Sequence, residues 1–293
     1  MSSPRADASE SETVGGCERS LRRDVVANFR RWNVKTMRSP FVIIVSLVQP
    51  ILTLLMFGLV FGGAASIVLA DTGFEGVNYV TFIVPAVVMQ VSLASALTSG
   101  IGLVTDIESG MFEKVLASPM RTTAVFAGKG MSEFLRIVVQ VLVVLALAVA
   151  VGGEVATGAF GVVAVLVICL LVALWFMIVS NALGVVTTDE ESISAGTNLL
   201  QFPLLFLSSA FLPLSALPGW IRAFATVNPV TYAVDALRAL VLGRRVPMVV
   251  EVSWFGGILD PVLVAVVVLV GLNVAFGGLL VAYVDRVDAS TFV

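Results

Sequence analysis

The stretch AFGVVAVLVICLLVALWFMIVSNALGVV, residues 159–186, contains no Asp, Glu, Lys, Arg or His. A helix needs about 20 apolar residues to cross the hydrocarbon core of a bilayer, so this stretch is long enough to span one. Over the whole chain, hydrophobic residues make up 58% and charged residues 13%. About a quarter of an ordinary soluble domain is charged. The sequence therefore predicts an all-α integral membrane protein.

Five further apolar runs flank this stretch. Together the six expected spans are residues 41–61, 79–104, 131–151, 159–186, 195–212 and 258–284. Basic residues crowd the segment before the first span and the loop between the second and third: Arg19, Arg22, Arg23, Arg30, Arg31, Lys35, Arg38, Lys114, Arg121 and Lys129. The loops 62–78 and 152–158 contain no Lys or Arg. Because basic residues concentrate in cytoplasmic loops, we expect a multi-pass plasma-membrane protein with both termini in the cytoplasm.

The chain divides into four parts by composition. Residues 1–18 are rich in Ser, Asp and Glu and lack apolar periodicity, which predicts a disordered cytoplasmic tail. We expect an amphipathic interfacial helix at 19–38, a six-span transmembrane domain at 39–285 and a cytoplasmic C-terminal tail at 286–293. Cys17 and Cys169 lie in unlike surroundings and the chain has no His, so no disulfide framework and no metal site are expected.

The placement of charged residues argues against an ion-driven carrier. Such carriers usually hold ionisable groups near the middle of the membrane. Four of the six spans contain none, and Glu133, Arg136 and Asp260 lie near the ends of spans three and six. The deep polar side chains are the amides of Gln90, Asn181, Gln201 and Asn273. Hydrogen bonding between helices is their favoured role, and a place on a transport pathway is the alternative.

Residues 19–38 form a basic amphipathic pattern. Leu21, Val25, Phe29 and Trp32 recur at helical spacing, and the neighbouring arginines lie off that stripe. This pattern predicts a helix that lies on the inner membrane surface. A plain membrane anchor is the simpler alternative.

The loop 105–130 is expected to contain a short helix of its own. Ser109 or Gly110 can open it, and Pro119 must close it because proline pushes the preceding residue out of the helical conformation. The enclosed turns carry an apolar patch ringed by charge, formed by Phe112, Val115 and Leu116. Such a patch is typical of a docking site for a soluble partner, although a surface turn that folds back on its own spans remains the alternative.

The segment 226–243 encodes another short helix. Asn228 is the expected N-cap, Pro229 takes the first helical position and Gly243 follows the last turn. Asp235 and Arg238 are spaced i,i+3 and can form an ion pair. If pairing is what matters, exchanging these two residues should restore part of the activity lost in either single variant. Their polar stripe should face protein or a wet pathway.

Two of these segments resemble a known family. The stretch DIESGMFEKVLASP, residues 106–119, resembles the first cytoplasmic loop of type-2 ABC transporter permeases, where an acidic cluster, a Gly and a Ser-Pro bracket a coupling helix. FLPLSALPGW (211–220) and NPVTYAVDALR (228–238) resemble the most recognisable region of that family. After its tail, nearly the whole chain is similar in plan to daunorubicin-resistance exporter permeases.

The resemblance implies roles for particular residues. The ATPase-coupling residues would be Asp106, Glu108, Gly110, Phe112, Glu113, Val115, Leu116 and Pro119. A re-entrant hairpin of two short helices between spans five and six would dip into the outer leaflet and carry Pro218, Trp220, Asn228, Pro229, Tyr232, Asp235 and Arg238. Spans one and five would form much of a dimer interface.

The chain lacks a phosphate-binding loop, because Gly128-Lys129 is followed by Gly130 and Thr123 stands where the first Gly is needed. We therefore expect no enzymatic activity and no cofactor on this chain, with ATP and Mg²⁺ bound by a separate ATPase subunit. The expected partners are that ATPase, a second copy of the chain in a homodimer, membrane lipids and a small hydrophobic substrate, and no nucleic acid.

These expectations combine into one function. The chain would be the permease subunit of an ATP-driven exporter that moves a hydrophobic or amphipathic, drug-like compound out of the cell. Export of a polysaccharide, a lipid-linked glycan or Na⁺ is an alternative. A non-transporting membrane scaffold or immunity protein of the same architecture is another, and a neighbouring gene for an ATPase would favour transport over it.

Overall fold

The computed structural model describes residues 21–38, 40–60, 62–63, 69, 74–110, 122–187, 189–246 and 257–291. Over these residues the fold is all-helical, as expected. The helices are α1 (Leu21–Met37), α2 (Pro40–Val60), α4 (Tyr79–Glu108), α6 (Thr122–Ala150), α7 (Gly158–Thr187), α8 (Glu190–Phe206), the 3₁₀ helix η1 (Leu214–Ala216), α9 (Gly219–Val227), α10 (Pro229–Leu242) and α11 (Leu259–Thr291).

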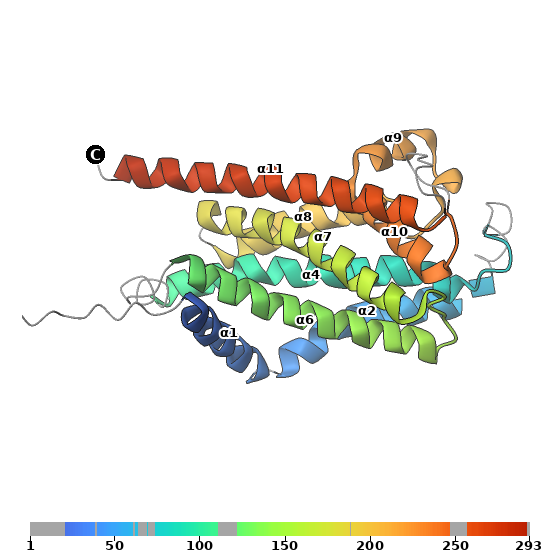
Figure 1. The fold of residues 1–293 in the computed structure, drawn as a ribbon, viewed down its shortest axis with the longest axis horizontal. Helices are drawn as coiled ribbons and strands as arrows, with labels where there is room; N and C mark the ends of the chain where they lie inside the picture. The colour runs from blue at the N-terminus through green and yellow to red at the C-terminus, as the bar shows by residue number, and fades with distance from the viewer. Residues whose placement is uncertain are drawn as a thin grey trace, which may run out of the picture.

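The longest helices run along the length of the molecule as one bundle (Figure 1). Helix α1 lies beside α6 at one end of the bundle, where α4 finishes and α6 begins; we call this the α1 end. Helices α9 and α10 lie at the opposite end, which we call the α10 end. Helix α1 and the pair α9 and α10 therefore lie at opposite ends of the bundle.

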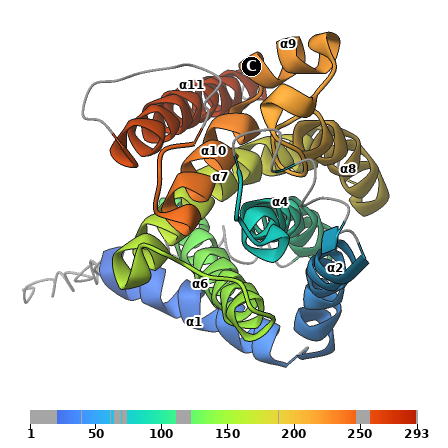
Figure 2. The ribbon, with the colours of Figure 1, turned by 90° about the vertical axis from the view of Figure 1, so that its right-hand side faces the viewer.

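Helix α4 forms the centre of the bundle, with α2, α6, α7, α8 and α10 packed around it (Figure 2). Of its 18-residue apolar stretch, 94% is buried inside the protein. Small residues let its neighbours approach closely: a Cβ atom on Gly100 would lie 2.3 Å from the Ser180 hydroxyl of α7. A helix that is apolar on every side is suited to this central position.

Among the described residues, four helices are long and apolar enough to cross a membrane: Tyr79–Glu108, Ala124–Ala150, Gly158–Gly184 and Leu259–Leu280. They correspond to expected spans two, three, four and six. Helix α6 begins before the expected start of span three because residues 122–130 continue as helix and pack against α1. The expected spans one and five correspond to α2 and α8. The apolar helix in α2 is shorter, Ile44–Gly58, and α8 has 17 residues.

Helix α8 starts at a side-chain cap. Asp189 accepts a hydrogen bond of 2.8 Å from the backbone N–H of Ser192. Hydrogen bonds from the hydroxyl and the backbone of Ser192 hold the pKa of the Asp189 carboxyl below its usual range. A charged carboxylate at a helix N-terminus is favoured, which fixes where α8 begins.

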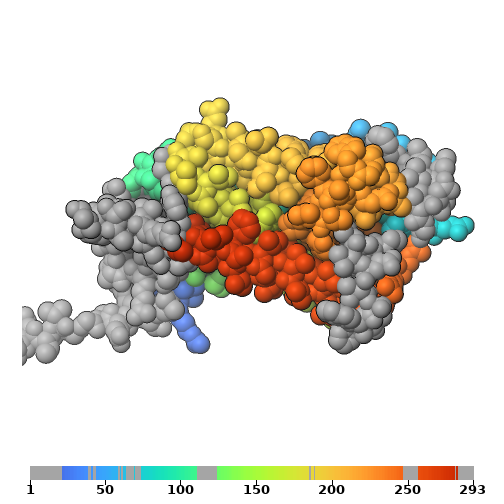
Figure 3. Space-filling view, turned by 90° about the horizontal axis from the view of Figure 1, so that it is seen from above, coloured from blue at the N-terminus to red at the C-terminus, as the bar shows by residue number. Residues whose placement is uncertain are grey.

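Helix α11 lies on the outside of the bundle. It contacts α7 and α10, and only 11% of its 18-residue apolar stretch is buried. Figure 3 shows it (red) running across the surface towards α9 (orange). Its exposed apolar side chains include Val267, Val274 and Leu279, each about two-thirds exposed. Such a surface is suited to a hydrocarbon environment rather than to water.

Candidate functional site

Helix α10 begins and ends at the residues expected from the sequence. The Asn228 side chain accepts a hydrogen bond of 2.9 Å from the backbone N–H of Val230, and Pro229 takes the first turn. Gly243 follows the helix in the left-handed conformation, at φ 65°. Asn228 also donates to the Leu204 carbonyl at 2.6 Å, which ties the start of α10 to α8. Local chemistry therefore sets the length of this helix.

Helix α10 is buried on nearly every face. It packs against α4, α7, α8 and α11 (Figure 2), and its interior residues are buried whether apolar or polar, apart from the half-buried Tyr232. The apolar stripe of Val230, Val234, Leu237 and Val241 is buried, and so is the stripe that carries Asp235 and Arg238. The polar stripe was expected to face either protein or a wet pathway, and in the structure it faces protein.

The expected ion pair between Asp235 and Arg238 is present. A guanidinium nitrogen of Arg238 lies 3.8 Å from a carboxylate oxygen of Asp235, and their relative exposures are 2% and 4%. Further contacts come from the turn after α8. Ser209 donates to Asp235 at 2.7 Å, and Arg238 donates to the carbonyls of Ser209 and Ala210 at 2.7 and 3.1 Å.

The guanidinium of Arg238 also lies 4.0 Å from the centre of the Phe82 ring of α4, at cation–π distance. Two charges are stable in such a dry place only when each is paired and hydrogen-bonded. The sequence identified the pair but missed Ser209 and Phe82. The polar Ser208-Ser209 dipeptide inside expected span five was the one available signal for the first.

The hairpin joins a buried helix to an exposed one. Trp220, Phe224 and Val227 of α9 are 63%, 60% and 83% exposed. Tyr232 of α10 is half-buried and donates to the Thr226 carbonyl at 2.6 Å, which closes the turn between the two helices. Pro218 precedes the first residue of α9. The large apolar side chains of α9 are therefore mostly exposed, whereas most of α10 is buried.

At the α1 end, a single carboxylate joins two helices. Asp106, in the last turns of α4, lies 3.3 Å from Arg31 and 3.2 Å from Lys35 of α1. Trp32, between these two cations, is 7% exposed. Its ring lies 5.5 Å from the Arg31 guanidinium, 4.6 Å from the Lys35 ammonium and 5.2 Å from the ammonium of Lys129 in α6. The contact unites α1, α4 and α6.

The face of α1 that packs on the protein is more polar than the expected stripe. Asp24, Asn28 and Trp32 are buried, whereas Val25 and Phe29 are half-buried. The side chain of Leu21 lies outside the described residues. The reason is a close approach to α6: a Cβ atom on Gly128 would lie 2.6 Å from Cβ of Asn28. A small polar residue fits this narrow contact, and the larger apolar residues lie at its edge.

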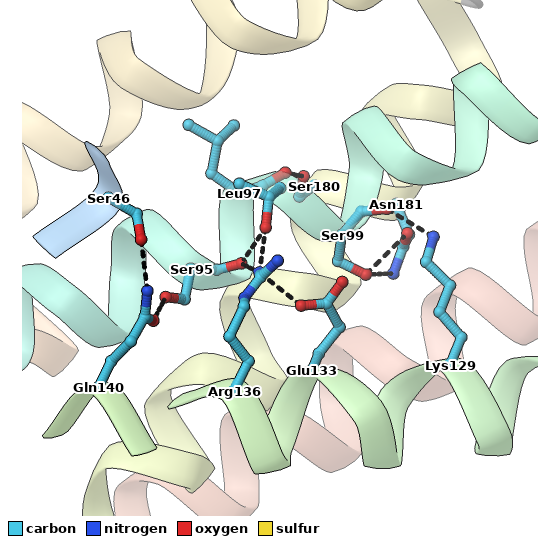
Figure 4. A network of polar contacts seen from close by, with 11 residues as sticks. Ser46, Ser95, Leu97, Ser99, Lys129, Glu133, Arg136, Gln140, Ser180 and Asn181 are labelled. Atoms are coloured by element: carbon cyan, nitrogen blue, oxygen red, sulfur yellow. Dashed lines mark hydrogen bonds and ion pairs between the residues drawn. The ribbon is translucent and has the colours of Figure 1, made fainter. Parts of the chain in front are cut away.

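Further along α6, charged side chains bind the backbone of α4 (Figure 4). Lys129 donates to the Ser99 carbonyl at 2.6 Å, and Arg136 donates to the Ser95 carbonyl at 2.7 Å. Arg136 also pairs with Glu133 and contacts the Thr98 hydroxyl.

Two further contacts hold the same stretch of α4. Ser180 of α7 donates to the Leu97 carbonyl at 2.9 Å. Gln140 of α6 contacts Ser95 and donates to Ser46 of α2 at 2.6 Å (Figure 4). Three carbonyls within two turns of α4, at residues 95, 97 and 99, therefore accept hydrogen bonds from neighbouring helices. We call the charged and polar contacts of α1, α4 and α6 described above the α1-end network.

The four amides differ in their surroundings. Asn181 donates to the Ser99 hydroxyl at 3.3 Å, and Asn273 donates to the Leu171 and Leu269 carbonyls at 3.0 and 2.8 Å. These two bond helices together. Gln90 and Gln201 are 7% and 4% exposed, and their side-chain oxygens have no hydrogen-bond partner among the described residues.

The expected coupling residues are only partly visible. Asp106 is buried in the α1-end network, Glu108 is exposed and Gly110 follows α4 at φ 64°. Phe112, Glu113, Val115, Leu116 and Pro119 lie outside the described residues. In the described part of the chain, no three His, Cys, Asp or Glu side chains gather as a metal site would require.

Comparison with known proteins identifies the family to which this chain belongs. The sequence model of the family described as "ABC-2 type transporter" matches residues 23–242, from the start of α1 to the last residue of α10. The chain belongs to the ABC-2 type transporter family. The expected resemblance is confirmed.

Relatives of this ABC-2 permease include drug-resistance proteins. The daunorubicin resistance ABC transporter permease protein DrrB1 of Streptomyces coeruleorubidus is 31% identical over 204 residues, which is 70% of each chain. The probable doxorubicin resistance ABC transporter permease protein DrrC of Mycobacterium tuberculosis is 26% identical over 225 residues, 75% of this chain and 78% of that one. The putative transport permease ycf38 of Porphyra purpurea is 25% identical over 237 residues, 79% of each chain.

Proposed function

We propose that this ABC-2 permease is half of a homodimeric exporter. Each copy would pair with a separate ATPase subunit and move a hydrophobic or amphipathic, drug-like compound out of the cell. The relatives named for daunorubicin and doxorubicin resistance support that substrate class. Polysaccharides, lipid-linked glycans and Na⁺ are the alternative cargoes. The exposed apolar faces of α2 and α8, which include Leu52, Met56 and Phe206, support a dimer in which these two helices meet.

The proposed topology has six spans, namely α2, α4, α6, α7, α8 with the turn after it, and α11. The α1 end would face the cytoplasm, because the basic residues of α1 and Lys129 of α6 lie there. The hairpin of α9 and α10 would then be re-entrant in the outer leaflet of the plasma membrane. The capped 14-residue length of α10 supports this placement, since such a helix is too short to cross.

Energy would enter through the loop 105–130, and the observation that carries this proposal is the α1-end network. Both described ends of the loop are held in it: Asp106 by two cations of α1, and Lys129 by the Ser99 carbonyl and the Trp32 ring. A push on the loop by an ATPase would therefore move α1, α4 and α6 together. Because α4 contacts α10 directly, the movement has a packed route to the hairpin at the other end.

The test first asks whether a neighbouring gene encodes an ATPase, and then uses the permease purified together with that subunit. We expect ATP hydrolysis that rises when daunorubicin is added to the reconstituted complex. Replacing Phe112 and Leu116 by Ser should remove a docking anchor, and the loss of such an anchor costs about 2 kcal/mol or more. Assembly with the ATPase should fall at least tenfold while the permease still inserts and dimerises. A double Ser variant that assembles and transports normally would contradict the coupling role.

Orientation is tested separately by single-cysteine labelling in intact cells, in a background without Cys17 and Cys169. A cysteine at Ser11 or Ser290 should be protected from an impermeant thiol reagent, and one at Ala65 should react. Reaction at Ser11 would reverse the proposed topology.

A further inference from the structure

One face of α1 holds a shallow depression of about 590 Å³, and two of its lining residues, Arg31 and Lys35, also pair with Asp106 of α4. It is lined by Ala27, Arg30, Arg31, Val34, Lys35 and Arg38. Four of these six residues are cationic, and no lining residue is acidic. The depression is therefore a concentrated positive surface with small apolar walls.

The positive charge of this depression is only partly balanced. Asp106 pairs with Arg31 and Lys35 from the protein side of α1. Arg30 and Arg38 are exposed and form no ion pair with any described residue. An arginine has a planar fork of N–H donors that matches the oxygens of a phosphate group. Two such forks are available here to bind one anion.

Exposed apolar side chains lie close to these cations in the sequence of α1 and at the start of α2. Val26, Val34 and Met37 of α1 are 61%, 39% and 76% exposed, and Phe41 of α2 is 74% exposed. A nucleic acid or a soluble acidic peptide would leave such side chains in water. The boundary between lipid headgroups and acyl chains accommodates both kinds of side chain at once.

We propose that the depression on α1 binds the phosphate headgroup of an anionic phospholipid. Arg30 and Arg38 hold the phosphate, while Val34, Met37 and Phe41 lie against the first methylenes of the acyl chains. This binding goes beyond the transport function and does not depend on the identity of the substrate. Clusters of Lys and Arg on amphipathic helices attract anionic lipids by about 1 kcal/mol per basic residue near the surface.

The experiment is native mass spectrometry of the purified full-length chain, titrated in detergent with phosphatidylglycerol or phosphatidylcholine. The test variant is Arg30→Gln with Arg38→Gln, which leaves both ion pairs of Asp106 intact. The matched control is Arg22→Gln with Arg23→Gln, which removes the same charge from exposed positions of α1 outside the depression. A third arm adds inorganic phosphate to the wild-type protein with phosphatidylglycerol bound.

We expect the wild type to retain phosphatidylglycerol in preference to phosphatidylcholine. The test variant should bind phosphatidylglycerol about 30-fold more weakly, in line with the loss of two headgroup-binding arginines at about 1 kcal/mol each, and the control should stay within about twofold of wild type. Equal losses in both double variants would show that bulk charge alone attracts the lipid, and would overturn the site. Equal retention of the two lipids, or displacement of phosphatidylglycerol by inorganic phosphate at equal concentration, would overturn it too.

Discussion

The buried pair of α10 and the α1-end network use the same kinds of side chain in opposite ways. In α10, Asp235 and Arg238 lie one turn apart on one helix and are almost completely inaccessible. At the α1 end, charges from three helices meet, and the side chains of Arg31 and Lys35 remain 34% and 53% exposed. The α10 pair is a closed contact, because both charges lie on one helix and are shielded from water. The ion pairs of Asp106 form an open contact, because they join two helices and their cations remain partly exposed.

This difference sets what each region can do. Breaking one partner of a buried, hydrogen-bonded pair leaves a charge with no water to solvate it. Partly exposed pairs are screened by water and contribute little to stability. We infer that the α10 pair fixes the structure of the hairpin, whereas the ion pairs of Asp106 with Arg31 and Lys35 can rearrange at low cost.

The largest effect is expected from Arg238→Met. Met fills much of the same space but leaves the Asp235 carboxylate without its cation, which costs about 3–5 kcal/mol for a buried pair. Thermal unfolding of the purified protein in detergent should show a large fall in melting temperature. The matched control is Arg222→Met in α9, where the arginine is exposed and should be replaceable with little change. Equal stability of the two variants would mean that the α10 pair is not a closed contact.

The exchange of Asp235→Arg with Arg238→Asp sharpens the same point. The sequence alone suggests that restoring a pair in reverse order restores part of the activity. The contacts predict otherwise, because Arg238 also binds the carbonyls of Ser209 and Ala210 and the ring of Phe82 from its own position. We expect the free energy of unfolding of the exchanged variant to fall by about 2–4 kcal/mol, the value of one or two hydrogen bonds to a charged group. Export activity near wild type in the exchanged variant would show that pairing alone is sufficient.

What the sequence could predict follows from how local each contact is. The caps of α10 at Asn228 and Gly243 and its i,i+3 pair depend on neighbours within one helix, so pattern reading found them. The partner of Asp106 could not be found this way, because Arg31 and Lys35 are 75 and 71 residues distant. The pattern of α1 was read only against a membrane, and it gave no sign that Asn28 packs against Gly128 of α6.

Gly128 shows the same limit. In the sequence it stands out only as part of an incomplete phosphate-binding motif. In the structure it is the point where α6 touches the backbone of α1, since an added Cβ atom would lie 2.8 Å from the Val25 carbonyl oxygen and 2.9 Å from the Phe29 nitrogen. Nothing local distinguishes it from Gly130, which has no atom within 4 Å of the same position.

These two glycines provide a medium-sized test of the α1 end. Gly128→Ala should destabilise the protein by about 1–3 kcal/mol, because α1 must move away from α6. Gly130→Ala should be neutral, or stabilising by up to about 1 kcal/mol, because alanine favours the helix and meets nothing. Thermal unfolding of both variants, with limited proteolysis of α1, measures the difference. If Gly128→Ala is as stable as Gly130→Ala, α1 is held less closely than the structure shows.

The smallest effect on stability, and the most informative one, is expected from Asp106→Asn. The variant loses both ion pairs to α1, but Arg31 and Lys35 can turn towards water. The free energy of unfolding should therefore fall by at most about 1 kcal/mol. Coupling should respond differently. Without the carboxylate, α1 no longer follows the end of α4, and drug-stimulated ATP hydrolysis by the reconstituted complex should fall several-fold. Glu191→Gln is the matched control, because it removes an exposed carboxylate at the start of α8. A fall of several kcal/mol in stability would make Asp106 a closed contact like the α10 pair, and unchanged hydrolysis would remove the α1 link from the mechanism.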